Sequence, residues 1–258
     1  MVAVIAGNGL GLGNTSLQQL GQGLGGQAAI GQDGVGQYVN AATGNLVLQT
    51  QDENLIFDGL SLNVLRTYNS QGQLAANGGW GFGFSRSVGG LTGTLDTAGS
   101  TVTRTDDDGS AVTYTYNATL DEYVSSGQSG AADTLTWNAT ASTWTWNDAA
   151  AAQQETYSAS GQLTTLSDAQ TGASYSFSYT SSHQLSQIVA GDGDTLLFGY
   201  NTSGQLTSLS VQEVPPGQTT PVTRQQVGYG YDSQGRLQTV TTTLGSDTDS
   251  STASYTTT

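Results

Sequence analysis

Tyr157-Ser-Ala-Ser-Gly161-Gln-Leu163 and Tyr200-Asn-Thr-Ser-Gly204-Gln-Leu206 share one spelling, Tyr-x-x-x-Gly-x-Leu, and this repeated stretch decides the fold. The other copies begin at Tyr68, Tyr179 and Tyr231, with a degraded copy at Tyr116. From Tyr157 onward the starting tyrosines follow one another at 22, 21 and 31 residues. Such a repeat indicates an architecture of stacked units, so the functional question moves from an active site to the surface that the stack builds.

Each residue type in the repeat has a physical reason for its place. The tyrosine ends the incoming strand, where a large ring buries apolar area while its hydroxyl can find a partner. Polar residues then turn the chain, the glycine takes a positive-φ position, and the leucine returns to the apolar face. We therefore expect structural roles at these positions. They are Tyr68, Gly72, Leu74, Tyr157, Gly161, Leu163, Tyr179, His183, Leu185, Tyr200, Gly204, Leu206, Tyr231, Gly235 and Leu237.

His183 occupies the glycine position of its unit and is the one histidine of the chain. A lone histidine invites a catalytic interpretation. Histidine is, however, among the non-glycine residues enriched at positive φ, and the position is a turn between two strands. The sequence therefore favours a structural role for His183 in a solvent-facing turn.

The chain divides into three segments by composition. Residues 1–36 are rich in glycine and glutamine and are expected to be a flexible leader. Residues 37–150 alternate apolar and polar residues, which predicts an entry region of β-hairpins. Residues 151–258 hold most of the repeats and predict a β-sheet array that continues beyond the chain end, with a loop insertion at the proline-rich residues 214–221.

The expected fold is all-β, with antiparallel hairpin repeats forming a spiralling sheet. Residues 45–51 and 60–68 alternate as strands with one buried face do, and Asp58-Gly59 between them is typical of a hairpin turn. One hairpin is marginally stable by itself, whereas stacked hairpins bury a continuous apolar face. An array without a cap exposes a strand edge, which favours self-association through that edge.

Composition narrows the classes of function. The 258 residues include no cysteine, five Lys plus Arg and twenty Asp plus Glu, which gives a formal net charge of −15. That charge argues against binding to nucleic acid or to anionic membrane surfaces. The sequence has no run of about 18 apolar residues, so membrane insertion is not expected. One histidine, no cysteine and no lysine leave no candidate catalytic triad or zinc site, and no cofactor is expected. A glycoside hydrolase with paired carboxylates stays a remote alternative, because nothing singles out two acids.

Two further patterns each allow two interpretations. Asp106-Asp-Asp-Gly109 and Asp192-Gly-Asp194 resemble pieces of calcium loops, but they lack the bidentate glutamate at the required offset and are equally typical of hairpin turns. Trp137, Trp144 and Trp146 could form a sugar-stacking platform, or they could pack in the core and across strands.

The unit Tyr231-Asp-Ser-Gln-Gly235-Arg-Leu237 resembles the hallmark of the YD-repeat, or RHS, family. Residues 39–46 through 65–70 are also similar to the N-terminal entry region of large bacterial RHS proteins. The resemblance covers about residues 36–258, and it implies a long β-ribbon that spirals into a hollow shell.

The resemblance carries expectations about function. In relatives the shell encloses a toxic C-terminal segment of the same or a partner chain, and in others, including animal teneurins, a similar shell acts in adhesion. Relatives also carry a self-cleaving motif near the end of the shell, which this chain lacks, so no catalytic residue is carried over. We expect the first part of a longer, secreted or surface-exposed bacterial polypeptide without a recognisable signal peptide. A cell-surface adhesin or carbohydrate-binding module is the alternative.

Overall fold

The computed structural model describes residues 3–5, 36–40, 44–70, 80–82, 86–106, 111–125, 133–148, 152–215, 217–244 and 254–257. These residues form strands and no helix, so the all-β prediction is confirmed. No helix in this part of the chain could therefore cross a membrane. The strands belong to two sheets, one of five strands and one of fifteen.

The five-stranded sheet comes first in the chain, with its strands in sequence order. Its strands are β1 (Ala3–Ile5), β2 (Gly36–Asn40), β3 (Leu46–Phe57), β4 (Leu60–Asn69) and β5 (Trp80–Phe82). β1 lies within the segment that was expected to be a flexible leader, and it pairs parallel with β2. The other pairs are antiparallel. Asp58 and Gly59 join β3 to β4 with φ values of 46° and 83°, as the two-residue turn of a tight hairpin requires.

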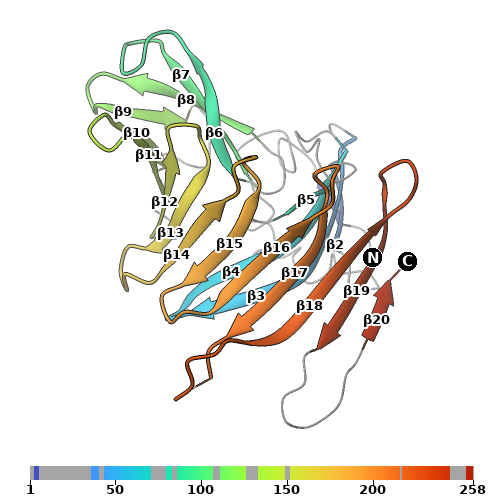
Figure 1. Ribbon diagram of the computed structural model, residues 1–258. Helices are drawn as coiled ribbons and strands as arrows, with labels where there is room; N and C mark the ends of the chain where they lie inside the picture. Colours follow the sequence, from blue (N-terminus) through green and yellow to red (C-terminus); the bar gives the residue numbers. More distant parts are fainter. Residues whose placement is uncertain are drawn as a thin grey trace.

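The fifteen-stranded sheet is an uninterrupted antiparallel meander, because each strand pairs with its neighbours in sequence. Its first strands are β6 (Ser87–Thr92), β7 (Thr101–Thr105), β8 (Ala111–Asn117), β9 (Glu122–Ser125), β10 (Thr134–Asn138), β11 (Thr143–Asp148) and β12 (Gln153–Ser158). The others are β13 (Leu163–Asp168), β14 (Ser174–Tyr179), β15 (Leu185–Ala190), β16 (Thr195–Tyr200), β17 (Leu206–Glu213), β18 (Val222–Tyr231), β19 (Leu237–Leu244) and β20 (Ser254–Thr257). The ribbon of strands turns steadily as it runs from β6 to β20 (Figure 1), so the predicted spiralling sheet is confirmed.

The ribbon bends back on itself at its first end. The backbone N–H of Val88 in β6 donates to the carbonyl of Gly161 in the turn between β12 and β13, at 3.0 Å. Ser87 and Gln162 form an antiparallel bridge beside it. Strands β6 to β12 therefore form a curl that closes against its own continuation.

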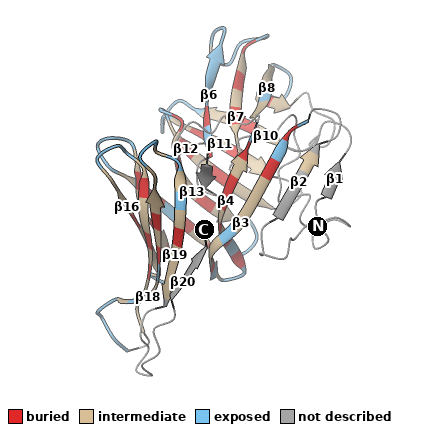
Figure 2. Ribbon diagram, turned by 90° about the vertical axis from the view of Figure 1, so that its right-hand side faces the viewer, coloured by how far each residue is buried: buried red, intermediate tan, exposed pale blue. Residues whose placement is uncertain are grey.

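The five-stranded sheet packs on the later strands of the ribbon. The Tyr175 hydroxyl in β14 donates to the Leu60 carbonyl in β4 at 3.0 Å, and both residues are buried. A Cβ atom on Gly191 would lie 2.5 Å from the Phe57 ring, so glycine gives the room that this ring needs. Buried residues alternate along the strands and face one shared core (Figure 2), as the alternating sequence pattern of residues 60–68 predicts.

Candidate functional site

The repeat units build one hairpin turn four times along the ribbon. In each unit the residue after the tyrosine accepts a hydrogen bond from the N–H three residues later, at 2.9 to 3.0 Å. The residue in the glycine position then has a positive φ: 82° at Gly161, 63° at His183, 79° at Gly204 and 76° at Gly235. A closed turn followed by one left-handed residue is the usual three-residue hairpin loop, and it explains the spacing from tyrosine to glycine.

Tyrosine and leucine of one unit face each other across the hairpin. Tyr157 pairs with Leu163, Tyr179 with Leu185, Tyr200 with Leu206 and Tyr231 with Leu237, each beside a register shift. Tyr157, Leu163, Leu185 and Leu206 are buried, whereas Tyr179, Tyr200, Tyr231 and Leu237 are half-buried and pack against the core. Tyr68 is half-buried near the end of β4, and Gly72 and Leu74 lie outside the described residues.

The tyrosine hydroxyls link successive units. The Tyr179 hydroxyl donates to the Leu163 carbonyl of the preceding unit at 2.7 Å. The Tyr231 hydroxyl donates in the same way to the Leu206 carbonyl at 2.8 Å. Burial raises the pKa of Tyr231 from 10 to about 12, so this donor stays protonated further into the alkaline range. Each of these two tyrosines therefore stabilises its own hairpin and also binds the preceding repeat unit.

A glutamine ladder runs along the turns and was missed by the sequence analysis. The side-chain amide of Gln162 donates to the His183 carbonyl at 3.2 Å, and Gln184 donates to the Gly204 carbonyl at 2.9 Å. Gln205 continues the series to the Gly235 carbonyl at 2.8 Å. Each glutamine follows the glycine position and binds the left-handed residue of the next unit. Recurrence of glutamine before the leucine was the signal that could have revealed the ladder.

A hydroxyl residue occupies the register shift in three units. Thr164, Ser186 and Thr207 follow the unit leucine and are the extra residues on their strands. Each hydroxyl donates to a backbone carbonyl of the partner strand, at 3.0, 2.9 and 3.1 Å. A bulge leaves backbone groups without a partner on the neighbouring strand. These hydroxyls supply hydrogen-bond donors to the backbone carbonyls beside the bulge.

A buried ionic cluster closes the curl. It consists of Arg86 before β6, Arg104 in β7, Asp106 after β7 and Glu155 in β12. Arg86 reaches Glu155 Oε1 at 2.5 Å, and Arg104 reaches Glu155 Oε2 at 2.8 Å. The side chain of Glu155 is 1% exposed, so its charge is compensated almost wholly by protein groups. Two positive and two negative residues balance, which satisfies the requirement for pairing inside a core.

Aromatic residues complete the surroundings of the buried ionic cluster. The Tyr157 hydroxyl donates to Glu155, and Arg104 donates to the Tyr157 oxygen at 3.1 Å. The Arg104 guanidinium lies 3.8 Å from the centroid of the Trp146 ring, a cation–π contact. Burial would raise the pKa of Glu155, but Arg104 and Arg86 outweigh it and hold that pKa below its usual value. The carboxylate therefore stays ionised in the core.

A second ion pair lies in the five-stranded sheet and accepts hydrogen bonds from the other sheet. Asp52 in β3 pairs with Arg66 in β4 at 3.0 Å. The hydroxyl of Tyr229 in β18 donates to the same carboxylate at 2.8 Å, and the Gln225 side chain donates to the Asp52 carbonyl at 3.3 Å. Burial raises the pKa of Tyr229, so this hydroxyl remains a donor even at alkaline pH.

The three tryptophans of the sequence analysis have different surroundings. Trp146 is buried beside Arg104 and donates from its indole nitrogen to the Tyr114 hydroxyl at 2.8 Å. Trp144 is buried and Trp137 half-buried, with ring centroids 5.1 Å apart. The three rings are therefore not exposed together as a flat platform. The core interpretation accounts for Trp146, and the other two indoles line a pocket.

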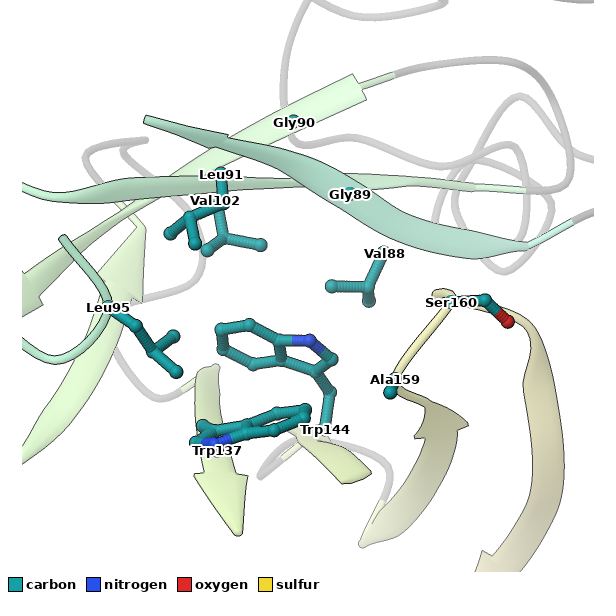
Figure 3. Close-up of a pocket in the computed structure, with 10 residues that line it drawn as sticks. All are labelled: Val88, Gly89, Gly90, Leu91, Leu95, Val102, Trp137, Trp144, Ala159 and Ser160. Carbon is teal, nitrogen blue, oxygen red and sulfur yellow. The ribbon is translucent and has the colours of Figure 1, made fainter. Parts of the chain in front are cut away.

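The pocket lies between β6 and the ends of β10 and β11, and we name it the Trp137–Trp144 pocket (Figure 3). Its volume is about 260 Å³. Its walls are formed by Val88, Gly89, Gly90, Leu91, Leu95, Val102, Trp137, Trp144, Ala159 and Ser160. Leu91 is 45% exposed, which places the pocket at the surface of the curl.

The acidic turns have structural partners. Asp106 belongs to the buried ionic cluster, and Asp107, Asp108 and Gly109 lie outside the described residues. Asp192 accepts a hydrogen bond from the Asp194 backbone at 3.1 Å within its own turn. Among the residues that the structure describes, no group of three or more His, Cys, Asp or Glu side chains could hold a metal ion. The turn interpretation thus accounts for the contacts of Asp106 and Asp192.

Comparison with known proteins agrees with the repeat architecture. A family model described as Teneurin YD-shell matches residues 91–216, and a domain of unknown function, DUF6531, matches residues 36–114. No curated protein matches the chain. A porin-like protein from Bacteroides uniformis aligns over 86% of this chain and 86% of its own, with 12% identity and a TM-score of 0.21. At that score the likeness carries no argument about fold or function.

Proposed function

We propose, because the chain belongs to the YD-repeat (RHS) family, that it forms part of the wall of a hollow β-shell that encloses an effector segment. The single observation that carries the proposal is the uninterrupted order of the strands from β6 to β20. A meander that adds one hairpin after another, and curves as it grows, suits a wall that surrounds a volume. The enclosed segment would be the C-terminal effector of the same, longer polypeptide.

The contacts along the array support a structural role. The glutamine ladder and the tyrosine hydroxyls bind each unit to the next, so neighbouring hairpins are held together by side chains as well as by strand pairing. The most strongly buried charged residue among those described, Glu155, is held by two arginines and a tyrosine that fasten the curl. This environment suits a non-catalytic wall, in which ionisable groups serve packing.

Limited proteolysis tests the enclosure. The complete polypeptide that contains this chain is expected to keep its segment C-terminal to the array intact, while the same segment expressed alone is digested. Electron microscopy of the complete polypeptide is expected to show a hollow particle. A segment cleaved equally fast in both forms, or a reading frame with no further repeats, would contradict the proposal.

We also infer where in the cell the protein is found and how it contacts other copies of itself. Secretion or display on a bacterial surface fits a shell that delivers its contents, and cell fractionation with an antibody against the array tests it.

β20 is the last strand of the described sheet, and an open strand edge pairs readily with another strand. Sedimentation of the 258-residue chain is therefore expected to show association that rises with concentration. A strict monomer at high concentration would contradict pairing through this edge.

A further inference from the structure

The walls of the Trp137–Trp144 pocket are apolar or aromatic, with few polar groups. Val88, Leu91, Leu95 and Val102 surround the two indoles, and the polar side-chain groups of the lining are the Ser160 hydroxyl and the two indole N–H groups. That hydroxyl contacts the Ser158 hydroxyl at 2.9 Å and the Gln162 amide oxygen at 3.3 Å. A sugar would leave most of its hydroxyls without partners in such a pocket, which is unfavourable. A primary ammonium group has three N–H groups to satisfy, and the side chains of the lining offer it one acceptor, the Ser160 hydroxyl.

An aspartate adjoins the residue that forms one end of the pocket, Leu95. Asp96 follows Leu95 directly, and its backbone N–H donates to the Tyr123 hydroxyl at 2.8 Å. The Tyr123 ring lies 5.5 Å from the Trp144 ring, so Tyr123 links the backbone of Asp96 to the aromatic wall. Asp121 accepts a hydrogen bond from the Tyr116 hydroxyl at 2.6 Å, and the Tyr116 ring lies 5.2 Å from the Tyr123 ring, so both aspartates are attached to this pair of tyrosines. Both residues are exposed, and the chain carries a net charge of −15.

Aromatic faces, apolar walls and an acidic rim fit one chemical class of ligand. A quaternary ammonium group is positive, has an apolar methyl surface and needs no hydrogen-bond acceptor. Indole faces attract such cations through the ring quadrupole, and carboxylates at the rim add charge complementarity. We propose that the Trp137–Trp144 pocket binds the trimethylammonium group of a small molecule or a lipid headgroup. The carboxylate of Asp96 then lies beside the positive charge of that group.

Choline and its neutral isostere 3,3-dimethyl-1-butanol have the same shape, so comparing their binding measures the contribution of the positive charge. The intact chain is titrated with each compound at constant ionic strength, and the intrinsic tryptophan fluorescence is followed. Choline is expected to change the fluorescence saturably, and the isostere to bind at least about threefold more weakly. Equal binding of the two compounds, or no saturable change with choline, would overturn the proposal. Saturable binding of methyl glucoside in place of choline would overturn it in favour of a sugar site.

Two variants locate the binding. Asp96→Asn is expected to weaken choline binding by about threefold and to leave the isostere unaffected, because only the charge is lost. Asp58→Asn is the matched control, since Asp58 and Asp96 both have positive φ, at 46° and 55°, in exposed turns. Trp137→Leu is expected to abolish the response while the thermal unfolding curve shows that the protein is folded. Wild-type binding by a folded Trp137→Leu variant, or an equal loss with Asp58→Asn, would place the binding elsewhere.

Vesicles distinguish a free ligand from a headgroup. Phosphatidylcholine vesicles are expected to compete with choline if a lipid headgroup is the source, and to have no effect if the source is a free quaternary ammonium compound. The proposal holds for both sources, because the group recognised is the same. It would be overturned if vesicles bind equally well to the Trp137→Leu variant and choline fails to compete.

Discussion

Gly161 differs from the other glycines at the left-handed turn position. All of them have positive φ, but a Cβ atom on Gly161 would lie 1.7 Å from the Val88 carbonyl oxygen in β6. Gly172, with φ of 77°, has nothing within 4 Å of the same position. Gly161 is therefore required for two reasons: its backbone has a left-handed conformation, and the β6 backbone, which closes the curl, lies against it.

We predict that Gly161→Ala destabilises the protein more than Gly172→Ala. Alanine at Gly172 carries the left-handed strain alone, about 1–2 kcal/mol. Alanine at Gly161 must also displace the β6 backbone and lengthen the Val88 to Gly161 hydrogen bond. Urea unfolding of both variants measures the free energies. Equal losses would mean that β6 does not press on this turn in solution.

His183 is the exception that tests the turn assignment. Its φ is 63°, its side chain is exposed, and its ring nitrogen contacts the Gln162 amide oxygen at 3.3 Å. His183→Gly is expected to leave the free energy of unfolding unchanged or to raise it by about 1 kcal/mol, because glycine relieves the left-handed strain. Urea unfolding checks this, with His183→Ala, which retains the strain, as the control. A loss of stability in both variants would show that the imidazole contact matters more than the strain.

At the scale of the hairpin, the glutamine ladder couples each turn to the next. We predict that Gln205→Ala lowers the free energy of unfolding by about 1 kcal/mol, because the Gly235 carbonyl loses its side-chain donor. Gln170→Ala is the matched control on an exposed turn and is expected to change stability by less than about 0.5 kcal/mol. Urea unfolding compares the two.

Hydrogen exchange locates the coupling. In Gln205→Ala the amides of the turn that follows β18 are expected to exchange faster, while those of the turn after β12 keep their protection. Uniform acceleration across the sheet would indicate global destabilisation and contradict a nearest-neighbour ladder.

The sequence predicted those strands and turns whose conformation depends on neighbouring residues. Alternation in residues 60–68 predicted β4, and Asp58-Gly59 predicted its turn, because pleat and turn geometry depend on nearby residues. The repeat predicted the hairpins of the ribbon for the same reason. The contact of Val88 with Gly161, the burial of Glu155 and the pairing of β1 with β2 could not be predicted, since each joins segments far apart in sequence. The Trp137–Trp144 pocket also depends on that closure, although its tryptophans were recognised.

For the molecule as a whole, the buried ionic cluster determines how firmly the curl is closed. Glu155→Gln would leave Arg86 and Arg104 buried with less negative charge, which commonly destabilises by about 3–5 kcal/mol. Glu213→Gln is the control, because the Glu213–Arg224 pair is 38% and 30% exposed and is worth at most about 1 kcal/mol. Urea unfolding is expected to separate the two variants clearly. Similar losses would mean that the cluster does not secure the curl.

The same cluster predicts how stability depends on pH. The pKa of Glu155 is lowered in the folded protein, so its stabilising contribution is complete above the unfolded value of about 4.3 and is lost as pH falls through the folded pKa. Glutamine does not ionise, so the difference in unfolding free energy between wild type and Glu155→Gln should shrink as the pH falls below about 4. Urea unfolding from pH 7 to pH 3 measures this difference. A constant difference over that range would show that ionisation of Glu155 does not hold the curl closed, and that the variant acts through packing alone.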